Sequence, residues 1–328
     1  MDIEKLKKIY RLGFPEDRED YVDYFFKKKI KSAEVFCFEK DGRTLSCAYV
    51  FMRKLCVFNN ETELPFLVGA ATLPEFRGNK LFFNVMKDIF LRYKNFPFIA
   101  LYPFKHEYYN KNFGFTNYYY AEKYQSIDTL KTAFKSYRRL NLKETADYSL
   151  LNEIYSGRAA VAKSYVVRDA AYFKAKVDEH AVDGGEVVLF FDDKGATAYA
   201  FVDKSGGIEE VCIKNETPDK EKTPAMMIRI LNVEAALRLF KPKADVDTTI
   251  EVRDDFFDET KGMFSIKFKD GKCDILKLQK TRANAAKYVL DVRDLTNIMF
   301  DGAAFDKGEA YACLNALFGV NTFGLEKY

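Results

Sequence analysis

The pattern of apolar and polar positions predicts a unit of mixed helices and strands in roughly the first 120 residues. Residues 80–93 carry apolar side chains at intervals of three and four, which is typical of an amphipathic helix. Two further helices are predicted at 2–12 and 17–30, followed by a short one at 105–111. The chain between these helices has the alternating or continuous apolar pattern of strands, which we expect at 33–38, 44–51, 55–58, 64–73, 96–101 and 113–120. Asp41-Gly42 predicts a hairpin turn between the first two strands.

Two further units follow, separated by a polar stretch at 215–224 that contains two prolines and reads as a linker. In the second unit we expect helices at 147–163 and 169–180 and a three-strand meander at 186–191, 196–202 and 207–213. In the third we expect helices at 226–240, 291–299 and 308–318 and strands at 247–253, 263–268 and 272–278. The pattern therefore predicts an α+β protein with domains at 1–122, 123–222 and 223–328.

Composition excludes several classes of protein. The 328 residues include 52 basic and 49 acidic side chains, so the net charge of +3 gives no reason to expect a nucleic-acid partner. Disorder is excluded by the 16% of aromatic residues. We expect a cytoplasmic protein with no membrane partner, because the chain opens without a secretory signal and has no apolar stretch long enough to span a bilayer. The six cysteines form no CxxC pair and only two histidines occur, so no metal site is expected.

The segment Val68-Gly-Ala-Ala-Thr-Leu-Pro-Glu-Phe-Arg-Gly-Asn-Lys-Leu-Phe-Phe83 has the most informative pattern. It predicts a buried strand, a tight turn at Arg77-Gly78 and then a helix. Free backbone N–H groups and the dipole at a helix N-terminus favour an anion, and Arg77 adds a positive charge. The segment is therefore either a pyrophosphate-binding site or an ordinary strand–helix junction.

A second segment, Leu101-Tyr-Pro-Phe-Lys-His-Glu-Tyr-Tyr-Asn-Lys-Asn-Phe-Gly-Phe115, predicts a strand, a short helix and another strand. Together the two segments resemble the GNAT superfamily of acyl-CoA-dependent N-acetyltransferases. The resemblance implies acetyl-CoA as cosubstrate, with its pantetheine and thioester along the strand and its pyrophosphate at the turn and helix start. The residues implied are Ala70, Ala71, Thr72, Arg77, Gly78, Asn79, Lys80, Leu81 and Phe82. It also implies Tyr109, with Tyr108 as rival, as the acid beside the thioester sulfur.

The segments 224–237 and 290–302 are similar to the C-terminal domain of the Eis-like acetyltransferases. That resemblance implies a GNAT domain, a second, degenerate GNAT-like domain and a sterol-carrier-protein-like domain, assembled as a homo-oligomer. It further implies that the carboxylate of the last residue, Tyr328, reaches the active site and serves as the base.

The sequence departs from the family motif at two positions. Lys80 occupies the place of the first motif glycine and Phe82 that of the small residue. Glycine permits positive φ or close backbone approach, so Lys80 either supplies charge to a phosphate or marks a site that no longer binds CoA. Among other candidates, His106 and the acids at 20, 23, 209 and 210 are better explained as solvated or capping side chains.

The function expected is acetyl-CoA-dependent transfer of an acetyl group to an amine of a small molecule or peptide. Aminoglycosides, polyamines, peptides and lysine side chains are all open as acceptors. The alternatives are a catalytically inactive binding or scaffold protein with the same fold, and a lipid-binding module.

Overall fold

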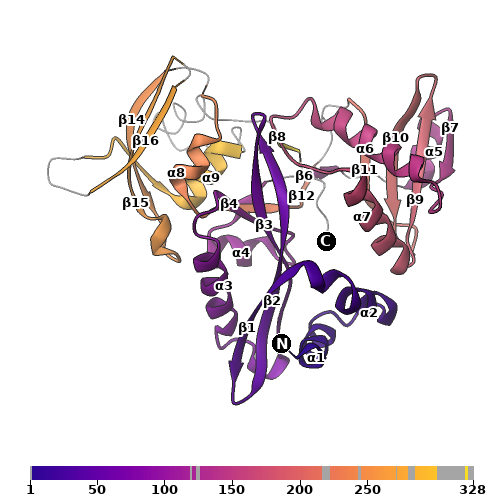
Figure 1. Cartoon of the computed structure of the whole chain (residues 1–328), viewed down its shortest axis with the longest axis horizontal. Coiled ribbons are helices and arrows are strands. Elements are labelled where there is room, and N and C mark those ends of the chain that lie inside the picture. The colour runs from indigo at the N-terminus through magenta and orange to yellow at the C-terminus, as the bar shows by residue number, and fades with distance from the viewer. Residues whose placement is uncertain are drawn as a thin grey trace.

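The computed structural model has three lobes joined around one central sheet (Figure 1). It describes residues 2–118, 120–122, 126–215, 222–242, 245–270, 272–279, 285–300 and 322–323. The predicted helix at 308–318 and the chain end at Tyr328 lie outside these residues.

The first lobe contains four α-helices and six strands among its described residues. Its elements are α1 (Ile3–Gly13), α2 (Glu19–Lys27), η1 (Lys29–Ser32), β1 (Ala33–Lys40), β2 (Arg43–Val57), β3 (Asn60–Thr72), η2 (Pro74–Phe76), α3 (Leu81–Arg92), β4 (Phe98–Leu101), α4 (His106–Phe113), β5 (Thr116–Asn117) and β6 (Tyr120–Glu122). The expected hairpin turn at Asp41-Gly42 joins β1 and β2, and both of its residues have positive φ. The strand expected at 55–58 is the end of a continuous β2. The one expected at 113–120 is shorter, because α4 extends through Phe113.

The second lobe is smaller and has its own antiparallel sheet. Its elements are α5 (Ile127–Ala133), β7 (Ser136–Arg139), α6 (Thr145–Ala159), β8 (Ser164–Val166), α7 (Ala170–Val182), β9 (Glu186–Asp192), β10 (Gly195–Val202), β11 (Ile208–Ile213) and β12 (Lys222–Pro224). Four of these strands form a sheet in the order β11-β10-β9-β7. The predicted three-strand meander is therefore confirmed, whereas the short β7 and β8 carried no sequence pattern that we recognised.

The third lobe packs short helices on a mixed sheet. Its elements are β13 (Met227–Ile230), α8 (Val233–Arg238), β14 (Val246–Arg253), η3 (Asp258–Thr260), β15 (Gly262–Lys269), β16 (Lys272–Leu278), β17 (Tyr288–Asp291), α9 (Val292–Phe300) and β18 (Thr322–Phe323). The sheet order is β16-β15-β14-β17, with β17 parallel to β14.

The central sheet takes strands from all three lobes. Within the described residues it has eight strands, in the order β18-β8-β2-β3-β4-β13-β5, with β1 paired to β2. Most neighbours are antiparallel, but β3 pairs with β4 and β8 with β18 in parallel. The expected boundaries at 122 and 222 therefore do not separate the sheets, because β8 of the second unit and β13 of the third complete the first.

The helix predicted at 226–240 is wrong in its first half. Residues Met227–Ile230 form β13, which lies between β4 and β5, and only Val233–Arg238 is helical. All four residues of β13 are buried. A strand buried on both faces is continuously apolar, and over so few residues this pattern cannot be told from that of a buried helix.

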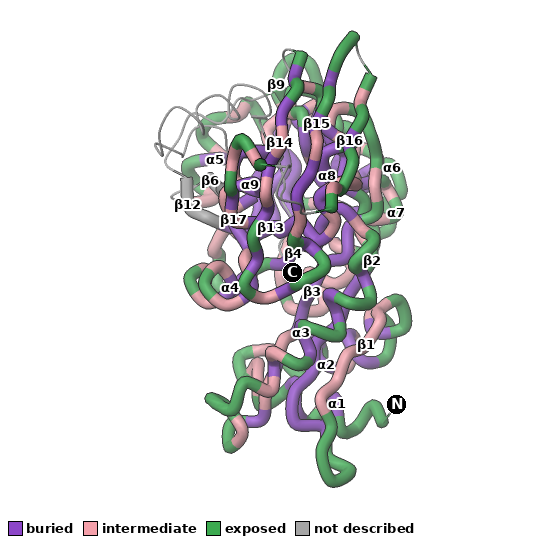
Figure 2. The backbone as a smooth tube through the Cα atoms, turned by 90° about the vertical axis from the view of Figure 1, so that its left-hand side faces the viewer, coloured by how far each residue is buried: buried purple, intermediate pink, exposed green. Residues whose placement is uncertain are grey.

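The two faces of the central sheet pack against different helices. On one face, α1 and α2 cover alternate residues of β2 and β3, including Tyr49, Phe51 and Val68. On the other face, α3 and α4 cover the intervening residues, including Val50 and Leu67. The strands lie at the centre of the buried core (Figure 2). The helices thereby hold the carboxyl ends of β3 and β4, where a cavity opens.

Candidate functional site

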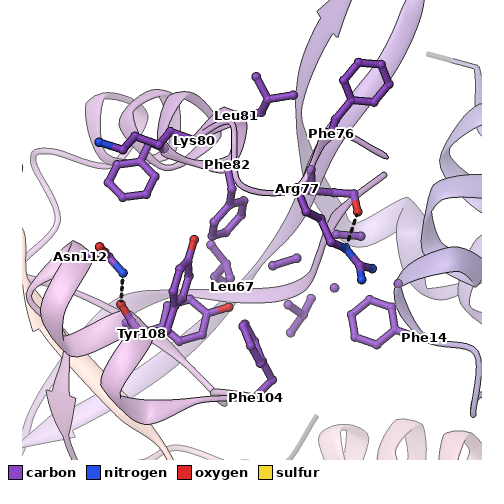
Figure 3. Close-up of a pocket in the computed structure, with 18 of the residues that line it drawn as sticks. Phe14, Leu67, Phe76, Arg77, Lys80, Leu81, Phe82, Phe104, Tyr108 and Asn112 are labelled. Atoms are coloured by element: carbon purple, nitrogen blue, oxygen red, sulfur yellow. Dashed lines mark hydrogen bonds between the residues drawn. The ribbon is translucent and has the colours of Figure 1, made fainter. Parts of the chain in front are cut away.

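The cavity opens where β3 and β4 separate. The two strands pair in parallel at Phe66 with Ala100 and at Leu67 with Leu101, and their pairing ends there. Beyond that point a cavity of about 720 Å³ opens between the end of β3, the start of α3 and the helix α4 (Figure 3). The carboxyl end of a parallel strand pair is a common ligand site, because diverging strands leave a crevice there.

A bulge in β3 shapes one wall of this cavity. The register between β2 and β3 shifts so that Gly69 and Ala70 lie opposite the single residue Ala48. Gly69 has a φ of +60°, a conformation that side-chain-bearing residues rarely adopt. Bulges bend a strand and redirect its backbone. Residues 67–72 consequently line the cavity along one side.

The turn after β3 places a positive charge at the second wall. The Arg77 side chain donates through Nε to the carbonyl oxygen of Thr72 at 3.2 Å and through Nη2 to that of Leu12 at 3.5 Å. It lies beside Phe14, on the side of the cavity away from Lys80 (Figure 3). These two contacts fix the orientation of an exposed guanidinium, which is otherwise expensive to order.

Lys80 immediately precedes α3 and has a left-handed conformation, with φ of +56° and ψ of +22°. The backbone geometry for which the family motif uses glycine is therefore kept, although a lysine occupies the position. Its ammonium lies 5.9 Å from the centre of the Phe83 ring. Among the described residues no side chain caps the N-terminus of α3, so the first-turn N–H groups at Leu81 and Phe82 are available to an anion.

The helix α4 provides the third wall with its two adjacent tyrosines. Tyr109 is 3% exposed and packs edge-on against the rings of Tyr108 and Phe104. Burial raises the pKa of the Tyr109 phenol, and the neighbouring Tyr108 raises it further. Burial also raises the pKa of Tyr108. Within the described ranges the Tyr109 hydroxyl takes part in no hydrogen bond, so it can donate to a bound molecule.

Most of the residues expected in the site line this one cavity. They are Ala70, Ala71, Thr72, Arg77, Gly78, Lys80, Leu81, Phe82 and Tyr109. Asn79 does not line it, because its side chain turns back to donate to the carbonyl oxygen of Phe76 at 3.2 Å. The rival Tyr108 also lines the cavity. Tyr328 lies outside the described residues.

The remaining lining residues were not expected from the sequence. They are Gly13, Phe14, Glu16, Leu67, Val68, Gly69, Phe76, Phe83, Tyr102, Phe104 and Asn112. Phe104 is 76% exposed at the rim of the cavity. Pro103 and Lys105, on either side of Phe104, are compatible with a loop. Nothing in the sequence indicated that the Phe104 side chain lines the cavity.

The other candidates have structural partners. Asp23 is bound by Lys7 and Lys27, whose hydrogen bonds lower its pKa to about 2, and Asp20 pairs with Arg18 at 3.1 Å. His106 is half-buried rather than solvated, does not line the cavity, and has its pKa lowered by burial. In the second lobe, the paired acids Glu209 and Glu210 contact His180 and Arg168 respectively. No three His, Cys, Asp or Glu side chains of the described segments are grouped as a metal site.

Two family models match the chain. Residues 1–117 match the acetyltransferase (GNAT) domain, and residues 233–316 match the sterol carrier protein domain. The chain carries a GNAT acetyltransferase domain followed by a sterol carrier protein domain. The sterol carrier match begins after β13, which agrees with the place of that strand in the central sheet.

Solved structures share this fold over the whole chain. One is a protein of Enterococcus faecalis described as a probable N-acyltransferase, with a TM-score of 0.75, 13% identity and coverage of 98% of this chain and 97% of that one. A GCN5-related N-acetyltransferase of Anabaena variabilis has a TM-score of 0.73, 14% identity and coverage of 99% and 97%. Eis1 of Mycobacterium abscessus has a TM-score of 0.70, 12% identity and coverage of 99% and 97%.

The GNAT domain makes this protein an acyltransferase, since domains of this family use an acyl-CoA cosubstrate. No curated protein matches the sequence. Across the described part of the chain, no helix is both long and apolar enough to cross a membrane.

Proposed function

We propose that this protein transfers an acetyl group from acetyl-CoA to an amine. The observation that supports the proposal best is that one cavity joins an uncapped helix N-terminus to the buried phenol of Tyr109. The turn and helix start suit a pyrophosphate, and the phenol suits a departing thiolate. The backbone of 70–72 runs between them, which is the path that the pantetheine arm would need.

In this proposal the pyrophosphate is bound by the N–H groups at the start of α3 together with Arg77 and Lys80. Charge-assisted hydrogen bonds of this kind are about twice as strong as neutral ones. Lys80 supplies an additional charge while its left-handed backbone preserves the shape of the turn. This arrangement favours retained CoA binding over the alternative of an inactive scaffold.

Transfer requires a neutral amine and a proton for the CoA sulfur. Tyr109 donates that proton: its raised pKa keeps the phenol protonated throughout the neutral range. We propose the carboxylate of Tyr328 as the base that deprotonates the ammonium through water, on the strength of the family resemblance alone. The amine nitrogen then attacks the thioester carbonyl, the C–S bond breaks, and CoA leaves as the thiol. The new amide nitrogen releases its extra proton, which restores the Tyr109 phenol.

The proposal leaves the acceptor amine open among aminoglycosides, polyamines, peptides and lysine side chains. We further propose that the protein is a cytoplasmic homo-oligomer, which sedimentation of the purified chain would test. Neither the acceptor class nor the oligomeric state changes the roles proposed for Arg77, Lys80 and Tyr109.

Calorimetric titration of the full chain with acetyl-CoA tests the proposal. Binding, followed by release of free CoA thiol with at least one amine class, supports an acetyltransferase. Binding without thiol release for any class points to the scaffold alternative. No binding at millimolar acetyl-CoA would remove the basis of the proposal, and titration with a fatty acid would then test the lipid-binding alternative.

A further inference from the structure

A buried arginine connects the third lobe with the helix that carries Tyr109. Arg229 lies in β13, on the face of the central sheet covered by α3 and α4, and is fully buried. Its guanidinium lies 4.5 Å from the centre of the Phe90 ring in α3. Burial lowers its pKa to about 10, and the charge of Asp254 opposes this effect. A buried charge persists only where specific partners compensate it.

The partners of Arg229 come from two different lobes. Nη1 donates to the carbonyl oxygen of Phe113, the last residue of α4, and Nη2 donates to the carboxylate of Asp254, directly after β14. The space is closely filled, because a Cβ on Gly114 would come within 2.9 Å of Nη1. The arginine therefore satisfies an end carbonyl of α4 and holds it against the third lobe.

Asp254 in turn organises an aromatic turn of the third lobe. Its Oδ1 accepts hydrogen bonds from the backbone N–H groups of Phe256 at 2.9 Å and Phe257 at 3.1 Å. These bonds set the direction in which the two rings leave the turn. Both rings pack against Phe90 of the first lobe, but only that of Phe256 also contacts Phe113 and Phe83.

Phe256 contacts both helices that form the cavity. Its ring centre lies 4.9 Å from that of Phe113 in α4 and 5.9 Å from that of Phe83 in α3, and Phe83 lines the cavity. It also lies 5.3 Å from Phe90. The ring of Phe257 contacts only Phe90 among the described aromatic rings, at 5.4 Å. Phe256 therefore contacts α4 as well as α3, whereas the ring contact of Phe257 is with α3 alone. Substitution of each ring in turn can distinguish the contact with α4 from burial against α3.

We infer that Arg229, Asp254 and Phe256 form a positioning element through which the sterol-carrier-like lobe sets the place of α4, and so of Tyr109, relative to the start of α3. This inference rests on the proposed function, because Tyr109 is taken as the acid. The three residues are not catalytic, since none of them lines the cavity. Their role is to keep the phenol at the correct distance from a thioester held by β3 and α3.

The matched pair Phe256→Leu and Phe257→Leu tests this inference. We expect Phe256→Leu to lower kcat about tenfold or more, because small misplacements of a catalytic group cost that much, while the KM for acetyl-CoA stays within about threefold. Phe257→Leu should leave kcat within about twofold. Equal losses of kcat in the two variants, or losses that follow their free energies of unfolding, would overturn the inference.

A charge-free double variant, Arg229→Met with Asp254→Asn, separates positioning from stability. Removal of both charges of a buried ion pair is often neutral for folding, and the amide oxygen still accepts from the N–H groups of Phe256 and Phe257. We expect a folded protein that binds acetyl-CoA with an affinity within about threefold of the original, yet has lost tenfold or more of kcat. Full activity in the folded double variant would show that the pair only supports the fold.

Hydrogen exchange distinguishes this inference from the proposed function. The amides of α4 should exchange faster in Phe256→Leu and in the double variant than in Phe257→Leu, whether or not the original protein acetylates an amine. Unchanged exchange in α4 would overturn the positioning role. An inactive original protein with the expected exchange pattern would instead count against the proposed reaction.

Discussion

Gly69 lies directly against Tyr49, so that a Cβ at Gly69 would come within 2.7 Å of Tyr49 Cδ2. The same residue has a φ of +60° and forms the bulge that turns the β3 backbone along the cavity. Steric contact and backbone conformation therefore both require glycine at this point of the wall.

Gly69→Ala should lower the free energy of unfolding by about 2–4 kcal/mol, because backbone strain and overpacking add. Denaturant titration measures the change. Gly78→Ala is the matched control: Gly78 also has positive φ, at +83°, but no heavy atom of the described residues, apart from its chain neighbours, lies within 4 Å of the added Cβ. It should cost about 1–2 kcal/mol from strain alone. Equal costs at both sites would contradict the steric role of Tyr49.

Lys80→Gly should raise the free energy of unfolding by about 1 kcal/mol, since it relieves the left-handed strain of a residue with a Cβ. Lys80→Ala keeps the strain and should give no such gain. If the ammonium also contacts a phosphate, both variants lose acetyl-CoA affinity equally. If Lys80→Ala raises the free energy of unfolding as much as Lys80→Gly does, the gain comes from loss of the lysine side chain and not from relief of backbone strain.

Arg77→Glu should weaken acetyl-CoA binding at least several-fold, because it removes a charge-assisted contact and adds repulsion of the phosphates. Calorimetry at low and moderate salt measures the effect, which should shrink as salt rises. Arg43→Glu is a suitable control, since Arg43 is exposed and its guanidinium lies 5.5 Å from the Phe76 ring, but it does not line the cavity. Similar losses in both variants would indicate a general charge effect.

Tyr109→Phe should lower kcat about 10²–10⁴-fold if Tyr109 is the general acid. Tyr108→Phe should have a much smaller effect, and the reverse result would assign the role to Tyr108. Burial raises the pKa of Tyr109, so the acid is protonated below its shifted value and is lost only above the ordinary phenol range near 10. A fall in kcat that begins near neutral pH would therefore have another cause.

Deletion of residues 325–328 should abolish acetylation while acetyl-CoA binding and folding persist, because the proposed base is lost with Tyr328. Extension of the chain beyond Tyr328 should reduce kcat nearly as much, since it moves the carboxylate. Loss of a general base costs about 10²–10⁴ in rate. Full activity of the shortened protein would exclude the carboxylate from the mechanism.

The sequence was most informative where a local pattern determines structure. The periodic helix α3 and the hairpin at Asp41-Gly42 were predicted because their signals lie within a few residues. The family motif likewise located the wall formed by 70–72 and the turn at Arg77.

Contacts between distant segments had no such local signal. β13 reads as the beginning of the helix that follows it, because its residues are apolar on both faces. The hydrogen bond from Arg229 to the end of α4 and the contact of Phe256 with Phe83 depend on how the third lobe packs against the first. Periodicity within one segment carries no information about that docking.

The central sheet also has a consequence for how the protein is made. During synthesis, β4 emerges more than 120 residues before β13, the strand that lies between it and β5. Until β13 is synthesised, the edge of β4 that β13 later covers has no partner strand in the nascent first lobe. Unpaired edges favour association with other chains. Residues 1–122 expressed alone would keep that edge permanently. The catalytic lobe is thus first in the sequence but among the last parts to be completed.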